Sequence, residues 1–203
     1  MKCERIPLGA QGAYLDTYFL ADSPELKAGA CRPAVVVCPG GGYAYTSDRE
    51  AEPIALALCA RGFHACVLRY PCAPARFPAA LRALAEAVAW VRAGAAENHV
   101  DPRQISVCGF SAGGHLAGSL GVFWNAPFLA AETGLVPQDM RPDKMVLCYP
   151  VITGGEFAHK GSFDNLLGAD ADAARRAEVS LEQHVTANTP PAFLWHTWTD
   201  RAA

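Results

Sequence analysis

The strongest constraint on the fold of this chain is the pentapeptide Gly109-Phe110-Ser111-Ala112-Gly113, because it joins an apolar, strand-like run to a helix-like run rich in small residues. A serine on so sharp a strand-to-helix turn holds its hydroxyl clear of the backbone. Glycines two residues to either side let the strand and the helix approach without Cβ clashes. The pattern is typical of a nucleophile elbow, and it predicts Ser111 as a catalytic nucleophile.

A second glycine cluster lies upstream, where the apolar run 33–38 leads directly into Pro39-Gly40-Gly41-Gly42-Tyr43. Three glycines by themselves would describe a flexible loop, so their interpretation depends on the elbow. Acyl transfer from an ester develops negative charge on the carbonyl oxygen, and one donor aimed at that oxygen in advance is worth about 3 to 4 kcal/mol. We therefore predict that the N–H groups of Gly41, Gly42 and Ala112 form an oxyanion hole.

Four segments together carry a resemblance to a known family. They are Cys38 to Tyr43, Ser47 followed by Glu50, Gly109 to Ala117, and Thr189 to Thr197. In these segments the sequence resembles α/β-hydrolase-fold serine esterases of the group that includes acetylxylan esterases and related carbohydrate esterases. The resemblance covers almost the whole chain, and it implies that Asp200, after the strand in the last segment, is the acid of a catalytic triad. The order serine, aspartate, histidine is the order that this fold uses.

The catalytic histidine has no candidate in this sequence. The resemblance implies a loop that follows one more helix and strand, whereas Ala203 stands three residues after Asp200. We expect all six histidines to be structural or solvated: His64, His99, His115, His159, His184 and His196. Because loss of one triad member typically costs about 10⁴- to 10⁶-fold in turnover, we expect the chain to be nearly inactive as it stands.

Apolar strand-like runs alternate with helical stretches along the chain, which is typical of a mostly parallel sheet with helices on both faces. We expect strands at 6–8, 13–20, 34–38, 65–69, 105–108, 145–149 and 192–197, the first two as an antiparallel pair. The predicted fold is thus a single α/β-hydrolase domain over 1–203, incomplete at the C-terminus and lacking the last strand and helix.

Local patterns predict two of the helices and leave one region open. Ser47 and Glu50 have the spacing of a capping box before a helix at 51–60. Within 81–91, Leu81, Leu84, Val88 and Val91 recur at three- and four-residue steps and form one apolar stripe. The glycine-punctuated region 151–178 fits either a lid or substrate wall or a solvated connection with one short helix.

Composition argues against several other classes of protein. The net charge of −3 is small and mixed in sign, which argues against nucleic-acid and membrane-surface binding. No signal peptide and no spanning run is visible, so we expect a cytoplasmic protein. Of the eight cysteines, four lie in apolar strand-like runs and none forms a Cys-x-x-Cys pair, so we expect packed thiols, no zinc or other metal, and no cofactor.

Three functions remain open at this stage. The first is a serine carboxylesterase acting on small acyl groups, acetyl in particular, on carbohydrate such as xylan fragments. The second is a serine peptidase of the same fold, which would usually need a gating domain for which this chain has no room. The third is a catalytically silent binding module. The substrate would be a small-molecule or oligosaccharide ester, while the sequence leaves acyl length, sugar and oligomeric state open.

Overall fold

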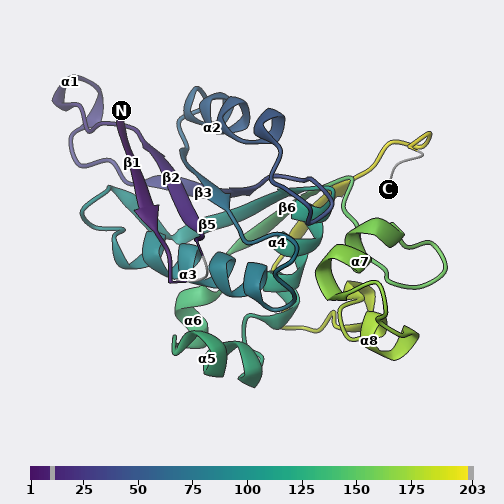
Figure 1. Ribbon diagram of the computed structural model, residues 1–203. Helices are drawn as coiled ribbons and strands as arrows, with labels where there is room; N and C mark the ends of the chain where they lie inside the picture. The colour runs from purple at the N-terminus through teal and green to yellow at the C-terminus, as the bar shows by residue number, and fades with distance from the viewer. Residues whose placement is uncertain (10–11, 201–203) are drawn as a thin grey trace.

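The computed structural model describes residues 1–9 and 12–200, which surround a seven-stranded sheet of order β1-β2-β4-β3-β5-β6-β7 (Figure 1). β1 pairs antiparallel with β2 and β2 antiparallel with β4, whereas all other neighbours are parallel. The strands are β1 (Lys2–Pro7), β2 (Tyr14–Phe19), β3 (Arg32–Cys38), β4 (His64–Arg69), β5 (Val100–Phe110), β6 (Lys144–Cys148) and β7 (Ala192–Trp195). The mostly parallel sheet predicted from the alternating pattern is confirmed.

Helices cover both faces of the sheet. The helical elements are α1 (Pro24–Lys27), η1 (Asp48–Glu50), α2 (Glu52–Cys59), α3 (Ala79–Ala93), α4 (Ala112–Phe123), α5 (Pro127–Thr133), α6 (Pro137–Met140), α7 (Lys160–Leu167), α8 (Ala173–Ala177) and η2 (Leu181–Gln183). In Figure 1, α2 lies above the sheet and α3 lies below it. Among residues 1–9 and 12–200, no helix has both the length and the apolar character that crossing a bilayer requires.

The core divides into two layers because successive side chains of a strand point to opposite faces. In β3, Val35 and Val37 join the cluster that packs against α2, while Val36 joins the larger cluster that packs against α3 and α4. The predicted stripe of α3 is buried, with each of its four residues at most 2% exposed. At about 1.5–3 kcal/mol for each large apolar side chain, this stripe is a substantial part of the core.

The parallel strands bring three loops to one edge of the sheet. Residue 38 of β3 pairs with residue 109 of β5, and residue 110 of β5 pairs with residue 148 of β6. The segments that follow these strands therefore begin side by side, at the carboxyl edge where sheets of this type bind ligands. The two predicted glycine motifs both lie at that edge.

The region 151–178 is more structured than a plain connection. It contains α7 and α8, which lie together to the right of the sheet in Figure 1. Its two ends meet, because the N–H of Leu181 donates to the carbonyl of Ile152 at 3.1 Å and the N–H of Gly154 donates to Ser180 Oγ at 2.9 Å. The sequence pattern left two interpretations open, and the structure shows a folded subregion rather than a solvated loop with one helix.

Candidate active site

Ser111 lies on a strained turn between β5 and α4. Its φ of 52° and ψ of −120° fall in a region that residues other than glycine rarely adopt. The surrounding hydrogen bonds hold this conformation: the N–H of Ser111 donates to the carbonyl of Cys148 at 3.0 Å, and its own carbonyl accepts from Val151 N at 3.1 Å. The residue predicted as nucleophile is therefore fixed to the end of β6 on both sides of its α-carbon.

The flanking glycines are required by close backbone contacts. A Cβ at Gly109 would lie 2.0 Å from the carbonyl oxygen of Gly113, and a Cβ at Gly113 would lie 2.1 Å from the carbonyl oxygen of Cys38. Contacts this short cannot be relieved by moving a flexible side chain, because both neighbours are backbone. The elbow therefore packs directly onto the end of β3, where the second glycine cluster begins.

Every carbonyl of the glycine loop is already engaged as an acceptor. The Gly40 carbonyl accepts from Ser47 N at 2.8 Å, and the Gly41 carbonyl accepts from Ala44 N at 3.0 Å and from Tyr45 N at 3.3 Å. The Gly42 carbonyl accepts from the side chain of Asn165, with Nδ2 at 2.9 Å. The N–H of Gly40 is engaged as well, since it donates to Glu50 Oε2 at 2.7 Å. Across the described chain, no hydrogen bond is formed by the N–H groups of Gly41 and Gly42.

The structure brings most of the predicted site residues around one cavity of about 520 Å³. Ser111, Gly41, Gly42 and Asp200 all line it. Ala112 is fully buried at the start of α4 and does not line the cavity, although its N–H directly follows Ser111 in the chain. The assignment of these residues to nucleophile, acid and oxyanion hole remains a prediction, but their placement around one space is what that prediction requires.

Asp200 reaches this cavity from the segment after β7. Its side chain is 20% exposed, and Oδ2 lies 3.9 Å from His196 Nε2. Its N–H donates to the carbonyl of Thr197 at 3.2 Å, which makes a turn after the strand. A carboxylate in this place is suited to orient an imidazole that approaches the serine.

His115 lies on the elbow helix and has a structural role. It is buried, with Nε2 at 2.8 Å from the carbonyl of Val179 and Nδ1 at 2.8 Å from the hydroxyl of Tyr43. Burial lowers the pKa of His115 to about 4, so the ring is neutral at pH 7. Nε2–H therefore donates to Val179 and Nδ1 accepts from Tyr43, which leaves neither nitrogen to act as a base toward Ser111.

His159, which we expect from the sequence to be structural or solvated, lines the cavity. It lines the same space as Ser111 and caps α7, because the N–H of Ser162 donates to its Nδ1 at 3.3 Å. Gly161 and Asn165 of α7 also line this space. No local pattern indicates these contacts, because α7 is brought to the site only by the folding of region 151–178.

The capping box predicted from Ser47 and Glu50 is wrong. The Ser47 side chain makes no capping hydrogen bond, and α2 begins at Glu52 after the short turn η1. The Glu50 side chain points instead to the site, where Oε2 accepts from Gly40 N at 2.7 Å and Oε1 accepts from the Tyr149 hydroxyl at 2.8 Å. Capping-box spacing cannot distinguish a glutamate that reaches back to its own helix from one with a distant partner.

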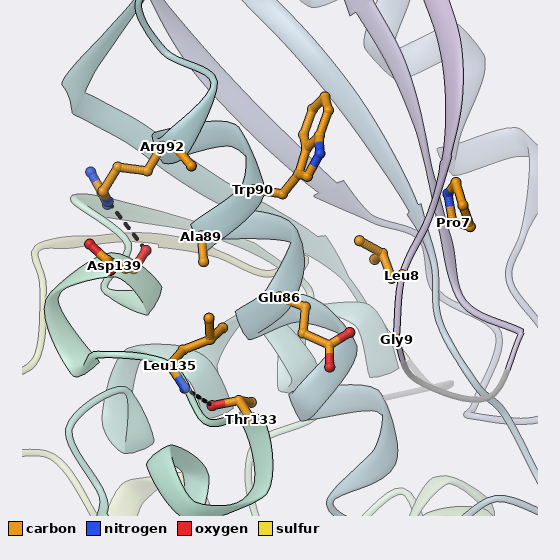
Figure 2. Close-up of a pocket in the computed structure, with 11 residues that line it drawn as sticks. Pro7, Leu8, Gly9, Glu86, Ala89, Trp90, Arg92, Thr133, Leu135 and Asp139 are labelled. Carbon is orange, nitrogen blue, oxygen red and sulfur yellow. Dashed lines mark hydrogen bonds between the residues drawn. The ribbon is translucent and has the colours of Figure 1, made fainter.

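A second cavity, of about 570 Å³, lies between α3 and the end of β1 (Figure 2). Glu86 and Trp90 from α3 and Leu135 from the α5–α6 connection border it. Among its lining residues that the structure describes there is no serine, cysteine or histidine. No group of three or more metal-ligating side chains is found in the described chain either. The predicted site residues do not line this second cavity.

A family model described as BD-FAE matches residues 22–203. The chain belongs to the BD-FAE family. Among curated proteins it is 36% identical over 178 residues to endo-1,4-beta-xylanase B of Butyrivibrio fibrisolvens, covering 83% of this chain and 27% of the relative. It is 28% identical over 193 residues to the acetylxylan esterase of Xylanibacter ruminicola, covering 90% of this chain and 35% of the relative.

Solved structures agree with this membership. The acetyl ester-xyloside bifunctional hydrolase from Caldicellulosiruptor lactoaceticus matches with a TM-score of 0.81 and 37% identity, over 95% of this chain and 68% of that one. The carboxylesterase Cest-2923 from Lactobacillus plantarum WCFS1 matches with a TM-score of 0.84 and 30% identity, over 100% of this chain and 74% of that one. The α/β-hydrolase fold is confirmed, and esterases are prominent among the relatives. The chain spans 27% and 35% of the length of the two curated relatives.

Proposed function

We propose that this BD-FAE protein is a serine carboxylesterase that removes small acyl groups, acetyl in particular, from carbohydrate such as xylan fragments. One observation carries the proposal: Ser111 stands on a strained elbow beside the glycine loop, residues 40–42. Among the described residues, the only peptide groups of this loop without a hydrogen-bond partner are the N–H groups of Gly41 and Gly42. A nucleophile next to unpaired amide donors is the arrangement that acyl transfer needs.

The reaction would proceed in two steps. Ser111 Oγ attacks the ester carbonyl carbon while a histidine takes its proton, and the carbonyl oxygen becomes an oxyanion that accepts from Gly41, Gly42 and Ala112 N–H. The C–O bond to the alcohol breaks, the histidine returns the proton to the alcohol, and an acyl-serine remains. Water then attacks the acyl-serine in the same manner and releases the carboxylic acid.

The base in this scheme is a histidine outside residues 1–200, oriented by Asp200. His115 is engaged at both ring nitrogens. His159 is tied through Nδ1 to Ser162, so in its neutral form the proton is on Nε2, and that nitrogen is a donor rather than a proton acceptor. Without the proposed histidine, Ser111 would be a weak nucleophile, and the 203-residue chain would have only residual activity.

The carbohydrate part of the proposal is supported by the names of the relatives and by the shape of the site. The matched proteins include an acetylxylan esterase and an acetyl ester-xyloside hydrolase. Tyr45 lines the cavity and is 58% exposed, which provides a flat face beside Ser111 for a sugar ring. A cavity of about 520 Å³ has room for a sugar unit as well as an acetyl group.

The test uses the complete gene product with 4-nitrophenyl acetate, with acetylated xylo-oligosaccharide and with an unmodified peptide. Ser111→Ala should lower turnover about 10⁴-fold or more, because the nucleophile is removed. Ser106→Ala is the matched control, since Ser106 lies five residues earlier, on the strand β5 that leads to Ser111, and is half-buried. Retained hydrolysis in Ser111→Ala would refute the proposal, and release of peptide fragments but not acetate would favour a peptidase.

The location of the base is tested separately with the 203-residue chain. We expect its hydrolysis rate to be near background, with part of the rate restored by added imidazole. A rate equal to that of a longer gene product, without imidazole, would show that the base lies within residues 1–203.

A further inference from the structure

We propose that Glu50 is the positioning residue of the oxyanion hole, holding the glycine loop so that the Gly41 and Gly42 N–H groups are the donors left for the reacting oxygen. This inference rests on the proposed function, since it assigns a role within the same site. It replaces the local capping role that the sequence spacing indicated for Glu50. Glu50 lines the same cavity as Ser111, but both of its carboxylate oxygens are engaged by protein donors, and the role that we assign to it acts through the loop.

The contacts of Glu50 place it at the first peptide of the loop. Oε2 accepts from Gly40 N at 2.7 Å. Gly40 in turn packs against the nucleophile, because a Cβ built on Gly40 would lie 3.2 Å from Ser111 Cβ and 2.8 Å from the carbonyl oxygen of Phe110. A movement of Gly40 would therefore change the distance between the loop donors and the serine.

The hydrogen bonds of the loop show why this one carboxylate matters. Residues 40–42 have three N–H and three C=O groups, and all three carbonyls are engaged. The Gly40 N–H donates to Glu50, so the N–H groups of Gly41 and Gly42 are the two peptide groups of this loop that have no hydrogen-bond partner among the described residues. Three consecutive glycines have little conformational preference of their own, so donor direction depends on the partners that hold the loop. Donors fixed before the reaction stabilise an oxyanion without reorganising during it.

The second oxygen of Glu50 connects the loop to the other side of the site. Oε1 accepts from the Tyr149 hydroxyl at 2.8 Å. Tyr149 directly follows β6, where its N–H donates to the carbonyl of Trp195 at 2.8 Å and its ring meets the Trp195 ring edge-on at 5.3 Å. Burial and the nearby Glu50 raise the pKa of Tyr149, which keeps its hydroxyl protonated as a donor. Glu50 thus joins the ends of β3 and β6, on either side of the strand that presents Ser111.

The negative charge of Glu50 does not itself favour an oxyanion, so its proposed role depends on its hydrogen bonds. Each oxygen accepts a hydrogen bond from a donor outside the hole. A glutamine can keep both contacts, with its carbonyl oxygen on Gly40 N–H and its amide group donating to the Tyr149 oxygen. An alanine can keep neither. Comparing Glu50→Gln with Glu50→Ala therefore separates the geometry of the link from its charge.

The experiment measures kcat and KM for 4-nitrophenyl acetate in the complete gene product. Glu50→Ala should lower kcat about 30-fold with KM within about twofold, because oxyanion donors act on the transition state. Glu50→Gln should remain within about fivefold of wild type, and Tyr149→Phe should fall between the two. Glu52→Ala is the matched control and should leave kcat unchanged, since Glu52 also accepts from a tyrosine hydroxyl, that of Tyr18 at 3.3 Å, but on the exposed side of α2.

Two further readouts separate positioning from general stability. A trifluoromethyl ketone, which forms an oxyanion on Ser111, should lose affinity in Glu50→Ala in parallel with kcat. Unchanged affinity, or a kcat within threefold of wild type, would overturn the inference. If Glu50→Ala fails to fold, a kcat within about fivefold of wild type in Glu50→Gln and a larger loss in Tyr149→Phe would support the inference. A Glu50→Gln loss above 30-fold, or a Tyr149→Phe kcat equal to that of wild type, would overturn it.

Hydrogen exchange at the Gly40 amide distinguishes this inference from the proposed function. The amide should exchange slowly in wild type and Glu52→Ala and quickly in Glu50→Ala. A wild-type protein that is inactive but shows this exchange pattern would refute the proposed esterase and support Glu50 as the residue that holds the loop. Fast exchange in wild type would overturn the inference whatever the activity.

Discussion

The two glycine-rich segments of the site are held in different ways. In the elbow, Gly109 and Gly113 are required because backbone atoms lie within about 2 Å of where a Cβ would be. In the glycine loop, Gly42 has no such neighbour: a Cβ there would come no closer than 3.7 Å to Ser162 Oγ, and Asn165 holds its carbonyl from α7. The elbow glycines are fixed by packing of backbone against backbone, whereas the two ends of the loop, the Gly40 N–H and the Gly42 carbonyl, are held by the side chains of Glu50 and Asn165.

A methyl group added to the elbow should have the largest effect on stability. Gly113→Ala should destabilise the protein by about 3 kcal/mol or more, because the Cβ would lie 2.1 Å from the Cys38 carbonyl oxygen and 2.5 Å from that of Pro39. Chemical denaturation measures this change in the free energy of unfolding. The control is Gly161→Ala in α7, where the nearest atom is His159 Cε1 at 3.8 Å and no loss is expected. Equal stability of the two variants would contradict the steric account.

The next largest effect concerns His115, which links the elbow helix to Tyr43 at the end of the glycine loop. Its pKa in the folded protein is about 4, below the ordinary 6.5, so the unfolded chain binds the proton first. The stability contributed by the neutral ring should be complete above about pH 6.5 and fall as pH drops toward 4, by up to about 3 kcal/mol. His115→Gln should flatten the pH dependence of unfolding over this window.

The control for this pH experiment is His196→Gln, which removes an imidazole at the exposed end of the chain. Both variants keep His64, whose burial also lowers its pKa, so the difference between them isolates His115. An unchanged slope in His115→Gln would mean that the elbow helix and the loop are not joined through a neutral imidazole.

The smallest expected effect is on kcat, after loss of the Asn165 side chain that holds the glycine loop. Asn165→Ala removes the donor to the Gly42 carbonyl, and kcat should fall about fivefold, the equivalent of one hydrogen bond of about 1 kcal/mol. Asn98→Ala is the matched control, because Asn98 Nδ2 also donates to a glycine carbonyl, that of Gly94 at 3.0 Å. Steady-state kinetics of the complete gene product measure both. A fall in kcat for Asn98→Ala of the same size would show that the effect is not specific to the loop.

Much of the fold follows from local sequence patterns. The triple valine of β3 and the stripe of α3 have the periodicity of the elements they form, and both are buried as expected. The elbow could be predicted because its pattern of one serine between two glycines is contiguous in the sequence, although its hydrogen bonds to Cys148 and Val151 could not. Asp200 came from the family resemblance, and the structure places it at the same cavity as Ser111.

The support of the site could not be predicted in the same way. Glu50 is ten residues from Gly40 and 99 from Tyr149, and Asn165 is 123 residues from Gly42. Contacts over such separations depend on which strands lie next to each other, and no local spacing records this. Glu50 is an example. Its spacing from Ser47 fits a capping box, but the partners of its side chain, Gly40 and Tyr149, are brought to it by the tertiary fold.

The segment from Ile152 to Leu181, which contains α7 and α8, can vary without disturbing the sheet. Because Ile152 and Leu181 are bonded to each other, the chain between them leaves the sheet and returns at nearly the same point. Insertions, deletions or whole grafts between these residues can then be accommodated without altering strand register. His159 and Asn165 lie within this exchangeable unit and border the cavity. In the esterase that we propose, changes within this unit would alter the cavity on one side of Ser111 and leave the strands that hold Ser111 unchanged.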